Sequence, residues 1–229
     1  MGEIHHRAFG QLFSDAIFFE RLANNEKDPA TCSRFARSAT LLSALSLECA
    51  ANCCLKQFSA NKKLLDDIDK LSFLSKFDLF AHLGFDKGID YGRSEVQKIT
   101  ELKQVRDSIV HAKVTTSELG VSDENHRHYS VGSDDLSFSI KPKRATGIVS
   151  NYQLLNHKDC FSALKSLVEF CNYYFIELLA MDKGLVFGLL NDNVIGLHEP
   201  YTSYPQELFS EQKYLISVGI NPVFWVSEP

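Results

Sequence analysis

Apolar residues recur every three or four positions along much of the chain, which is the spacing of one face of an α-helix. Within residues 95–113, for example, Leu102, Val105 and Ile109 fall on one such face. The long stretches with this spacing predict helices over 8–24, 29–58, 95–113 and 157–181. One or two shorter helices are predicted within 64–83. The pattern therefore indicates a mainly α protein built as an up-and-down helical bundle.

Local signals mark the start of two of these helices. Asp28 followed by Pro29 favours a helix start, because Asp caps free backbone amides and Pro is tolerated in the first turn. Ser94 with Gln97 three residues later has the spacing of a capping box, in which each side chain bonds the other residue's amide. We therefore expect the third long helix to begin next to Ser94.

The segment 115–155 has a different texture, with alternating β-branched, aromatic and polar residues separated by turn residues. This alternation predicts strands in 128–131, 136–140 and 147–153, forming a small hairpin or meander inserted between helices. After Gly188 the helical spacing is lost and prolines become frequent. We therefore predict one helical domain over 1–190, which includes the insertion, and an irregular tail over 191–229 that packs on the bundle.

Composition narrows the class of protein. The 229 residues are 45% hydrophobic, which is enough for one sizeable core, and the formal net charge of −5 disfavours a protein that coats nucleic acid. The six cysteines lie in helix-like stretches and the first ten residues lack a signal-peptide core, so we expect reduced cysteines and a cytoplasmic location. Charges at Lys165, Glu169 and Glu177 interrupt the most apolar stretch, so no membrane span is expected.

Three residues near the predicted end of the helix over 95–113 have chemistry suited to RNA cleavage: Arg106, Asp107 and His111. Cleavage without a metal ion needs a base for the 2′-hydroxyl proton, an acid for the leaving oxygen and a cation for the phosphorane. Histidine in general suits acid and base catalysis near neutral pH, and arginine offers a planar fork that matches phosphate oxygens. His111 is therefore the candidate acid and base, and Arg106 is the candidate cation.

The arrangement resembles the HEPN superfamily, whose signature is an Arg, a following polar residue such as Asp, and a His four to six residues after the Arg. The order of the predicted helices over 8–181 is also similar, whereas the insertion and the tail lie outside the family pattern. The resemblance implies a metal-independent endoribonuclease of a toxin or defence system, with no cofactor. It also implies a homodimer that joins two motifs in one cleft, RNA or a nucleotide as ligand, and a cognate antitoxin or other partner protein.

Helical geometry supports this interpretation only in part. Arg106 lies about 40° from Leu102 around an ideal helix, at the edge of the apolar stripe. His111 is four residues after Asp107, so the two side chains share a face and are able to hydrogen-bond. Arg106 and His111, however, lie about 140° apart on an ideal helix. They converge only if Arg106 reaches round the helix or if the helix end is distorted.

Glu48 is the second candidate, because a carboxylate in the otherwise apolar second helix is expensive to bury unless it is paired. Arg106 is its natural partner; alternatively, Glu48 points to solvent beside the apolar face. HEPN proteins often carry an acidic or polar residue at this place, which Glu48 and Asn52 resemble. Lys103, Lys113 and Asn52 are predicted as further binding residues.

Two other groups of residues suggest a metal site at first sight. Cys49 and Cys53 share a helix face, but no second Cys or His pair completes a tetrahedral zinc site, so we expect buried structural roles and no metal. His126 and His128 lie in a polar segment, where ordinary solvated side chains are the expectation.

Three functions remain open from the sequence. The first is the endoribonuclease, with His111 as acid and base, Arg106 as phosphate stabiliser, and Asp107 or Glu48 as the orienting group. The second is a non-catalytic HEPN-like module that binds nucleotide, RNA or protein, with Arg106 and Glu48 as a structural pair. The third is an unrelated helical protein.

Overall fold

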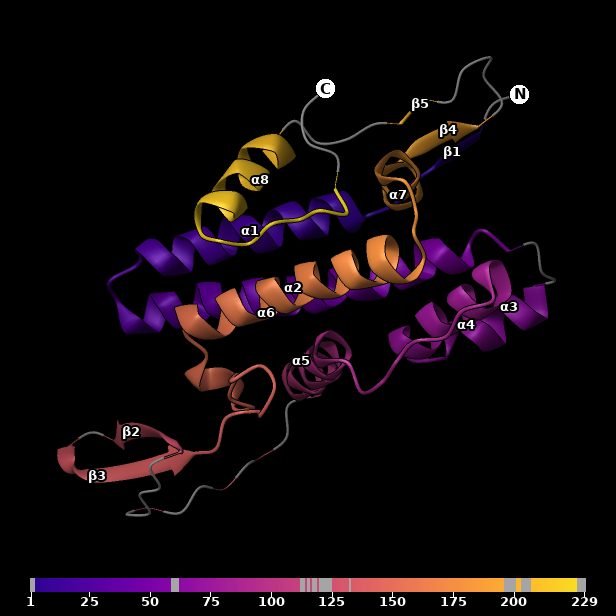
Figure 1. Cartoon of the computed structure of the whole chain (residues 1–229). Coiled ribbons are helices and arrows are strands. Elements are labelled where there is room, and N and C mark those ends of the chain that lie inside the picture. The colour runs from indigo at the N-terminus through magenta and orange to yellow at the C-terminus, as the bar shows by residue number, and fades with distance from the viewer. Residues whose placement is uncertain are drawn as a thin grey trace.

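The computed structural model describes residues 3–58, 62–111, 114, 116, 119, 125–131, 133–195, 201–202 and 207–225. Within these residues the chain forms a layered helical bundle with two small antiparallel sheets (Figure 1). The helices are α1 (Phe9–Asn25), α2 (Pro29–Leu55), α3 (Lys62–Asp69), α4 (Phe73–Phe85), α5 (Ser94–Val110), η1 (Tyr152–Leu154), α6 (His157–Cys171), η2 (Asn172–Leu178), α7 (Lys183–Leu190) and α8 (Glu207–Ser217). The strands are β1 (Glu3–His5), β2 (Arg127–Val131), β3 (Ser133–Ile140), β4 (Asn193–Ile195) and β5 (Tyr201–Thr202). The mainly α prediction is confirmed.

Helix α2 lies at the centre of the bundle, where it contacts α1, α4, α5, α6 and α7. Figure 1 shows α2 and α6 side by side, with α1 and α8 on one side and α4 and α5 on the other. Small residues let these neighbours approach closely, since Ala36, Ala39 and Ala50 are fully buried along α2. The buried hydroxyls of Ser43 and Ser46 donate to carbonyls one turn earlier in the same helix. These two hydroxyls are satisfied within α2, whereas the buried Thr40 hydroxyl of the same helix has no hydrogen-bond partner among the described residues.

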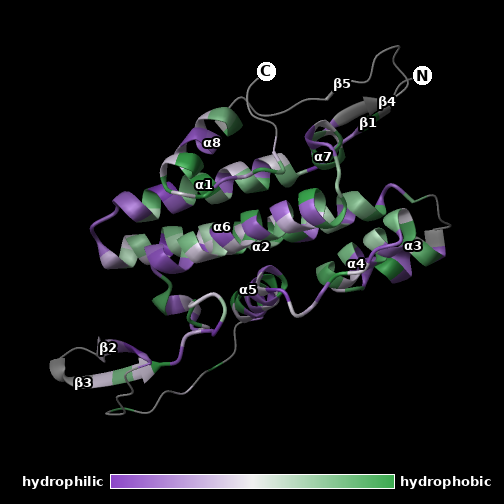
Figure 2. Ribbon diagram, viewed as in Figure 1, coloured by the Kyte–Doolittle hydropathy of each residue, from purple (hydrophilic) through white to green (hydrophobic). Residues whose placement is uncertain are grey.

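Hydrophobic and hydrophilic residues alternate along most helices, as amphipathic packing requires (Figure 2). Among the described residues, α2 is the one helix long and apolar enough to cross a membrane by length and composition, and 61% of its most apolar window is buried inside the protein. Core helices of soluble proteins and signal sequences share this composition. The expectations of no membrane span and of a cytoplasmic location stay predictions.

The last long helix was expected to run without interruption over 157–181, but it changes geometry at residue 172. There α6 continues into η2, a π-helical segment over Asn172–Leu178 that holds three consecutive buried aromatic residues. The hydroxyl of Tyr174 donates to the backbone carbonyl of Phe77 at 2.6 Å. Asn172 bonds the backbone of Asn221 and Phe224, so the C-terminal segment is tied to this wider turn.

The expectation of an irregular tail is wrong for the part of 191–229 that the structure describes. Strand β4 pairs with β1 and with β5, and α8 lies against α1. Beyond α8, Phe224 and Trp225 are buried and contact the rings of Phe9 and Phe13 at centroid distances of 5.6–6.2 Å. The tail therefore supplies part of the hydrophobic core as well as packing on the bundle.

The hydrophobic pattern does not predict the helix α8, because half of the residues on its buried face are polar. Its buried residues are Leu208, Glu211, Gln212 and Leu215, which have helical spacing but mixed chemistry. Glu211 pairs with Arg21 of α1 at 3.3 Å, and burial raises the pKa of its carboxyl. A pattern search for apolar residues misses such a face because two of its positions carry polar side chains.

The inserted hairpin is confirmed, but one predicted strand is wrong. Strands β2 and β3 pair antiparallel, with Tyr129 opposite Phe138 and their rings stacked at 5.4 Å. Residues 147–153 instead form a loop and the short helix η1. The amide of Val149 donates to the carboxylate of Asp159, and the amides of Ala145 and Thr146 donate to Glu101. Side-chain carboxylates satisfy these amides, so no strand partner is needed there.

The predicted capping box at Ser94 is also wrong. Arg93 is the residue that precedes the first turn of α5, and the Ser94 hydroxyl donates to Glu95 instead of accepting from an amide. A complete capping box occurs at the start of α6, where Asn156 and Asp159 bond each other's backbone amides. The capping-box spacing thus works at α6 and not at α5, because α5 begins at Ser94 itself and Arg93 occupies the cap position.

Candidate functional site

The motif residues lie at the C-terminal end of α5, which ends three residues earlier than expected. The helix stops at Val110, and His111 follows with φ −114° and ψ 51°, outside helical values. Its backbone amide still donates to the carbonyl of Asp107 at 2.9 Å, and its side chain is exposed. Lys113, predicted as a binding residue, lies outside the described residues.

This distortion bears on the angle between His111 and Arg106. The angle of about 140° between the Arg106 and His111 side chains assumes that both residues have helical φ. The φ of His111 is −114°, which differs from the helical value by about 50°. The direction of the His111 side chain is therefore set by the helix end and not by helical spacing. The helix end is therefore distorted, which is one of the two conditions under which the Arg106 and His111 side chains converge.

Arg106 is the most buried residue of the motif, with 17% of its side chain exposed. Its Nη2 atom donates to Oε2 of Glu48 at 3.1 Å, and its Nη1 atom lies 3.1 Å from Oδ1 of Asp107. Its Nε atom is buried and has no hydrogen-bond partner among the described residues. Two carboxylates thus hold the guanidinium at its outer nitrogens.

Glu48 points toward α5, which resolves the two alternatives left open above in favour of pairing. It lies on α2, and 38% of its side chain is exposed. The partner is the one predicted from the sequence, because Arg106 follows the buried residues Leu102 and Val105 of α5 and lies at the edge of the α2 contact. The ion pair between Glu48 and Arg106 therefore joins α2 to the end of α5.

Asp107 bridges two cations. Its Oδ2 atom accepts from Nζ of Lys103 at 2.9 Å, and its Oδ1 atom contacts Arg106. Lys103 and Asp107 are each about one-third exposed, so their one-turn pair contributes only about 0.3–0.5 kcal/mol. The expected side-chain bond from Asp107 to His111 is replaced by the backbone bond between the two residues. Lys103 thus pairs with a motif residue, and its predicted role in binding stays a prediction.

Asn52 belongs to a different polar centre. Its Oδ1 atom accepts a hydrogen bond from Nζ of Lys76 on α4 at 2.8 Å. Lys76 has 3% of its side chain exposed and also pairs with Asp69 at 3.0 Å. Asn52 therefore solvates the ammonium group of a buried lysine that the sequence did not single out, and its predicted role in ligand binding stays a prediction.

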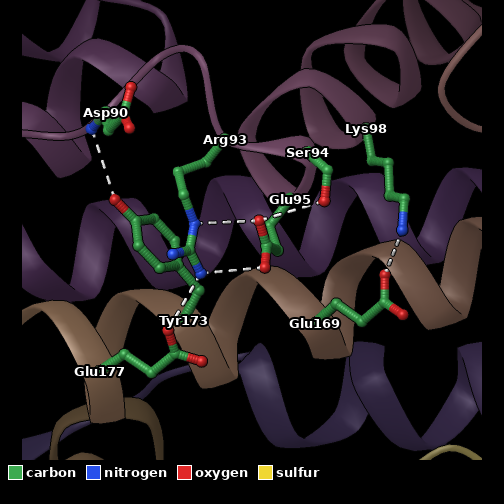
Figure 3. A network of polar contacts seen from close by, with 8 residues as sticks. All are labelled: Asp90, Arg93, Ser94, Glu95, Lys98, Glu169, Tyr173 and Glu177. Carbon is green, nitrogen blue, oxygen red and sulfur yellow. Dashed lines mark hydrogen bonds and ion pairs between the residues drawn. The ribbon is translucent and has the colours of Figure 1, made fainter.

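A larger ionic network holds the other end of α5 (Figure 3). The guanidinium of Arg93 lies 4.6 Å from the ring centroid of Tyr173, bonds both oxygens of Glu95, and reaches Glu177 at 3.0 Å. One turn further, Lys98 pairs with Glu169 of α6 at 2.7 Å. The contacts of Arg93 with Tyr173 and Glu177 and of Lys98 with Glu169 join α5 to α6 and η2. No local pattern predicts these three contacts, since their partners are more than 70 residues apart.

Within the described part of the chain, no group of three or more His, Cys, Asp or Glu side chains has the arrangement of a metal site. Comparison of the chain with protein-family models, with curated proteins and with solved structures finds no match. The resemblance to the HEPN superfamily therefore rests on the motif and the order of helices alone.

Proposed function

We propose that the protein is a HEPN-like endoribonuclease that cleaves RNA without a metal ion. The observation that carries the proposal is the placement of Arg106 between two carboxylates in the last turns of α5, whose C-terminal end is followed by the exposed His111. A guanidinium held by Glu48 and Asp107 has a set position, which reduces the entropy lost when it binds a phosphate. The biological role that we propose with it is that of a cytoplasmic toxin or defence effector with a cognate partner protein.

In the proposed reaction His111 takes the proton from the 2′-hydroxyl of the ribose, which then attacks the adjacent phosphorus. Arg106 stabilises the charge that develops on the phosphorane oxygens. A second histidine protonates the leaving 5′-oxygen, and a homodimer supplies it from the other protomer. The exposed position of His111 supports this step because a side chain that faces solvent is accessible to an RNA strand.

Cleavage of labelled single-stranded RNA in EDTA is the direct test. We expect His111→Ala to lower the cleavage rate at least about a hundredfold, as loss of a general acid–base group does. His82→Ala is the matched control, because His82 is also exposed and lies in the last turn of a helix. Equal cleavage by wild type and His111→Ala would contradict the proposal, as would a strictly monomeric protein with full activity.

A second candidate function has its own support. Both outer nitrogens of Arg106 are taken up by carboxylates and the side chain is largely buried, as in a structural ion pair. On this alternative the protein is a non-catalytic HEPN-like module that binds nucleotide, RNA or protein. Arg106 then stabilises the contact between α5 and α2 and does not bind a phosphate group.

Arg106→Ala separates the two candidates when stability and cleavage are measured together. Removal of the guanidinium leaves Glu48 unpaired, and we expect a loss of about 2 kcal/mol in the free energy of unfolding. Arg34→Ala, an exposed site on α2, is expected to stay within about 0.5 kcal/mol of wild type. Destabilisation together with an inactive wild type favours the binding module. An unchanged stability contradicts the structural pair.

A further inference from the structure

Three cations lie within four residues directly after strand β3, namely Lys141, Lys143 and Arg144, and we call residues 141–144 the basic turn. Lys141 and Arg144 are exposed, and Lys143 is partly exposed. Among the described residues, no carboxylate lies within ion-pair distance of these three side chains. Their positive charge is therefore open to an anion from outside the molecule.

The backbone next to the basic turn is fixed to α5. Both oxygens of the Glu101 carboxylate accept from the amide of Ala145 at 3.0 Å, and Oε2 also accepts from the amide and the hydroxyl of Thr146 at 2.9 Å. The amide of Lys143 donates to the carbonyl of Ile148 at 2.8 Å, which closes the backbone on itself. The basic turn therefore has a set position relative to α5.

Two further residues of α5 hold the segment that connects β3 to η1. The Nζ atom of Lys143 donates to Oε1 of Gln104 at 2.6 Å, and the hydroxyl of Ser108 donates to the carbonyl of Ser150 at 3.0 Å. Glu101, Gln104 and Ser108 have the spacing of one helix face, so the connecting segment follows this face of α5 (Figure 1). Because Gln104 is neutral, it positions the Lys143 ammonium without cancelling its charge.

This face of α5 leads to His111. Gln104 and His111 are seven residues apart, so on a helix their Cα atoms lie within about 20° of each other and about 10 Å apart along the axis. The His111 amide keeps its helical bond to the carbonyl of Asp107, so its Cα keeps this place although its φ is not helical. The basic turn thus flanks the helix end that carries the exposed His111.

We propose that the basic turn binds the backbone phosphates of an RNA strand and places this strand along α5 toward His111. The inference rests on the proposed endoribonuclease activity and names where its substrate binds outside the motif. Lysine and arginine bind phosphates through charge and do not read bases, so the site is expected to show little preference among sequences. A turn with a set position loses less entropy when it binds, which favours this role.

Binding of fluorescently labelled oligouridylate tests the proposal, with His111→Ala in every protein so that the strand stays intact. The variant combines Lys141→Gln, Lys143→Gln and Arg144→Gln. We expect its Kd to rise at least about tenfold at low salt, and the slope of log Kd against log salt concentration to fall by about 2, since each phosphate contact on a single strand contributes about 0.7. The melting temperature checks that each variant is folded.

The matched control removes the same charge from exposed lysines outside α5 and the basic turn: Lys27→Gln, Lys56→Gln and Lys183→Gln. Its Kd and salt slope are expected to stay within about twofold of the parent protein, because local contacts and not net charge carry the binding. Equal losses in the control and in the variant of the basic turn overturn the proposal. So does displacement of the RNA by polyglutamate at a lower concentration than by unlabelled RNA, which assigns the turn to an acidic protein.

Glu101→Ala separates charge from geometry. The change removes a negative charge, so electrostatics alone predicts tighter RNA binding. Loss of the anchor for Ala145 and Thr146 predicts the opposite, and we expect binding to weaken at least about threefold. Gln104→Leu is the milder variant, which frees only the Lys143 ammonium, and it is expected to weaken binding in the same direction. Tighter binding by both variants overturns the proposal.

Cleavage with an intact His111 distinguishes this inference from the proposed function. We expect the triple variant of the basic turn to raise KM at least about tenfold and to leave kcat nearly unchanged, as loss of binding outside the reacting groups does. Cleavage by wild type with an unchanged KM in the variant overturns the inference and leaves the endoribonuclease standing. RNA binding that depends on the basic turn, without cleavage by wild type, supports the inference and contradicts the endoribonuclease.

Discussion

Asp159→Ala is expected to lower the free energy of unfolding by about 4 kcal/mol, the largest effect that we predict for a single residue. The Asp159 side chain is fully buried and accepts hydrogen bonds from three segments, namely β2, the loop at Val149 and the start of α6. Its Oδ2 atom accepts from Arg127 at 2.8 Å and from the amide of Asn156 at 2.9 Å. Its Oδ1 atom accepts from the amide of Val149 at 3.3 Å. Removing the carboxylate leaves these donors without their acceptor and leaves the Arg127 charge unpaired.

Chemical denaturation of wild type, Asp159→Ala and Asp159→Asn measures the effect. The amide variant keeps one acceptor oxygen and nearly the same shape, so its loss is expected to lie between the other two. Asp182→Ala is the matched control: Asp182 caps α7 from an exposed position, and loss of such a cap costs about 1 kcal/mol. Equal losses for Asp159→Ala and Asp182→Ala would mean that burial of the carboxylate adds nothing.

Glu20→Ala is expected to cost about 3 kcal/mol and to loosen α8 from the bundle. Glu20 is buried on α1, where its Oε1 atom bonds Nε2 of His157 at 3.1 Å and its Oε2 atom accepts from the Tyr214 hydroxyl at 2.7 Å. The one carboxylate thus joins α1 to α6 and to α8. Without it, the partly buried Tyr214 hydroxyl loses its acceptor on α1, and a donor that lacks its partner away from solvent is expensive.

Hydrogen exchange of the amides in α8 and denaturation curves together test this prediction. We expect Tyr214→Phe to speed up exchange in α8 more than in α6, since it removes only one of the two contacts. Asp15→Ala, an exposed site on α1, is expected to change stability by less than about 0.5 kcal/mol. Slow exchange in α8 of the Glu20→Ala protein would show that the remaining contacts, the apolar ones and the pair of Glu211 with Arg21, hold this helix without Glu20.

The contact between Glu20 and Tyr214 also predicts a response to alkaline pH. Burial and the nearby Glu20 carboxylate raise the pKa of the Tyr214 hydroxyl above its ordinary value near 10. The unfolded chain therefore releases this proton first as the pH rises, so stability is complete below pH 10 and falls above it. In Tyr214→Phe this part of the alkaline loss disappears, and the difference between the two proteins above pH 10 measures it.

The sequence by itself determined the main helices, because their apolar faces repeat over many turns and each repeat adds to the signal. The spacing placed α1, α2 and α5 close to their observed bounds, and it identified the hairpin formed by β2 and β3. It also named Arg106 as the natural partner of Glu48, but it left open whether Glu48 is paired or points to solvent, and the structure shows the pair.

The tertiary structure alone decided the features that depend on partners distant in the chain. Asn52 accepts a hydrogen bond from Lys76, and the amide of Val149 in the loop over 147–153 donates to the Asp159 carboxylate. Helix α8 buries two polar residues, Glu211 and Gln212. The physical reason is common to these cases. Hydrophobic spacing is a local property, whereas the partner of a buried polar group is chosen by which segments the fold brings together.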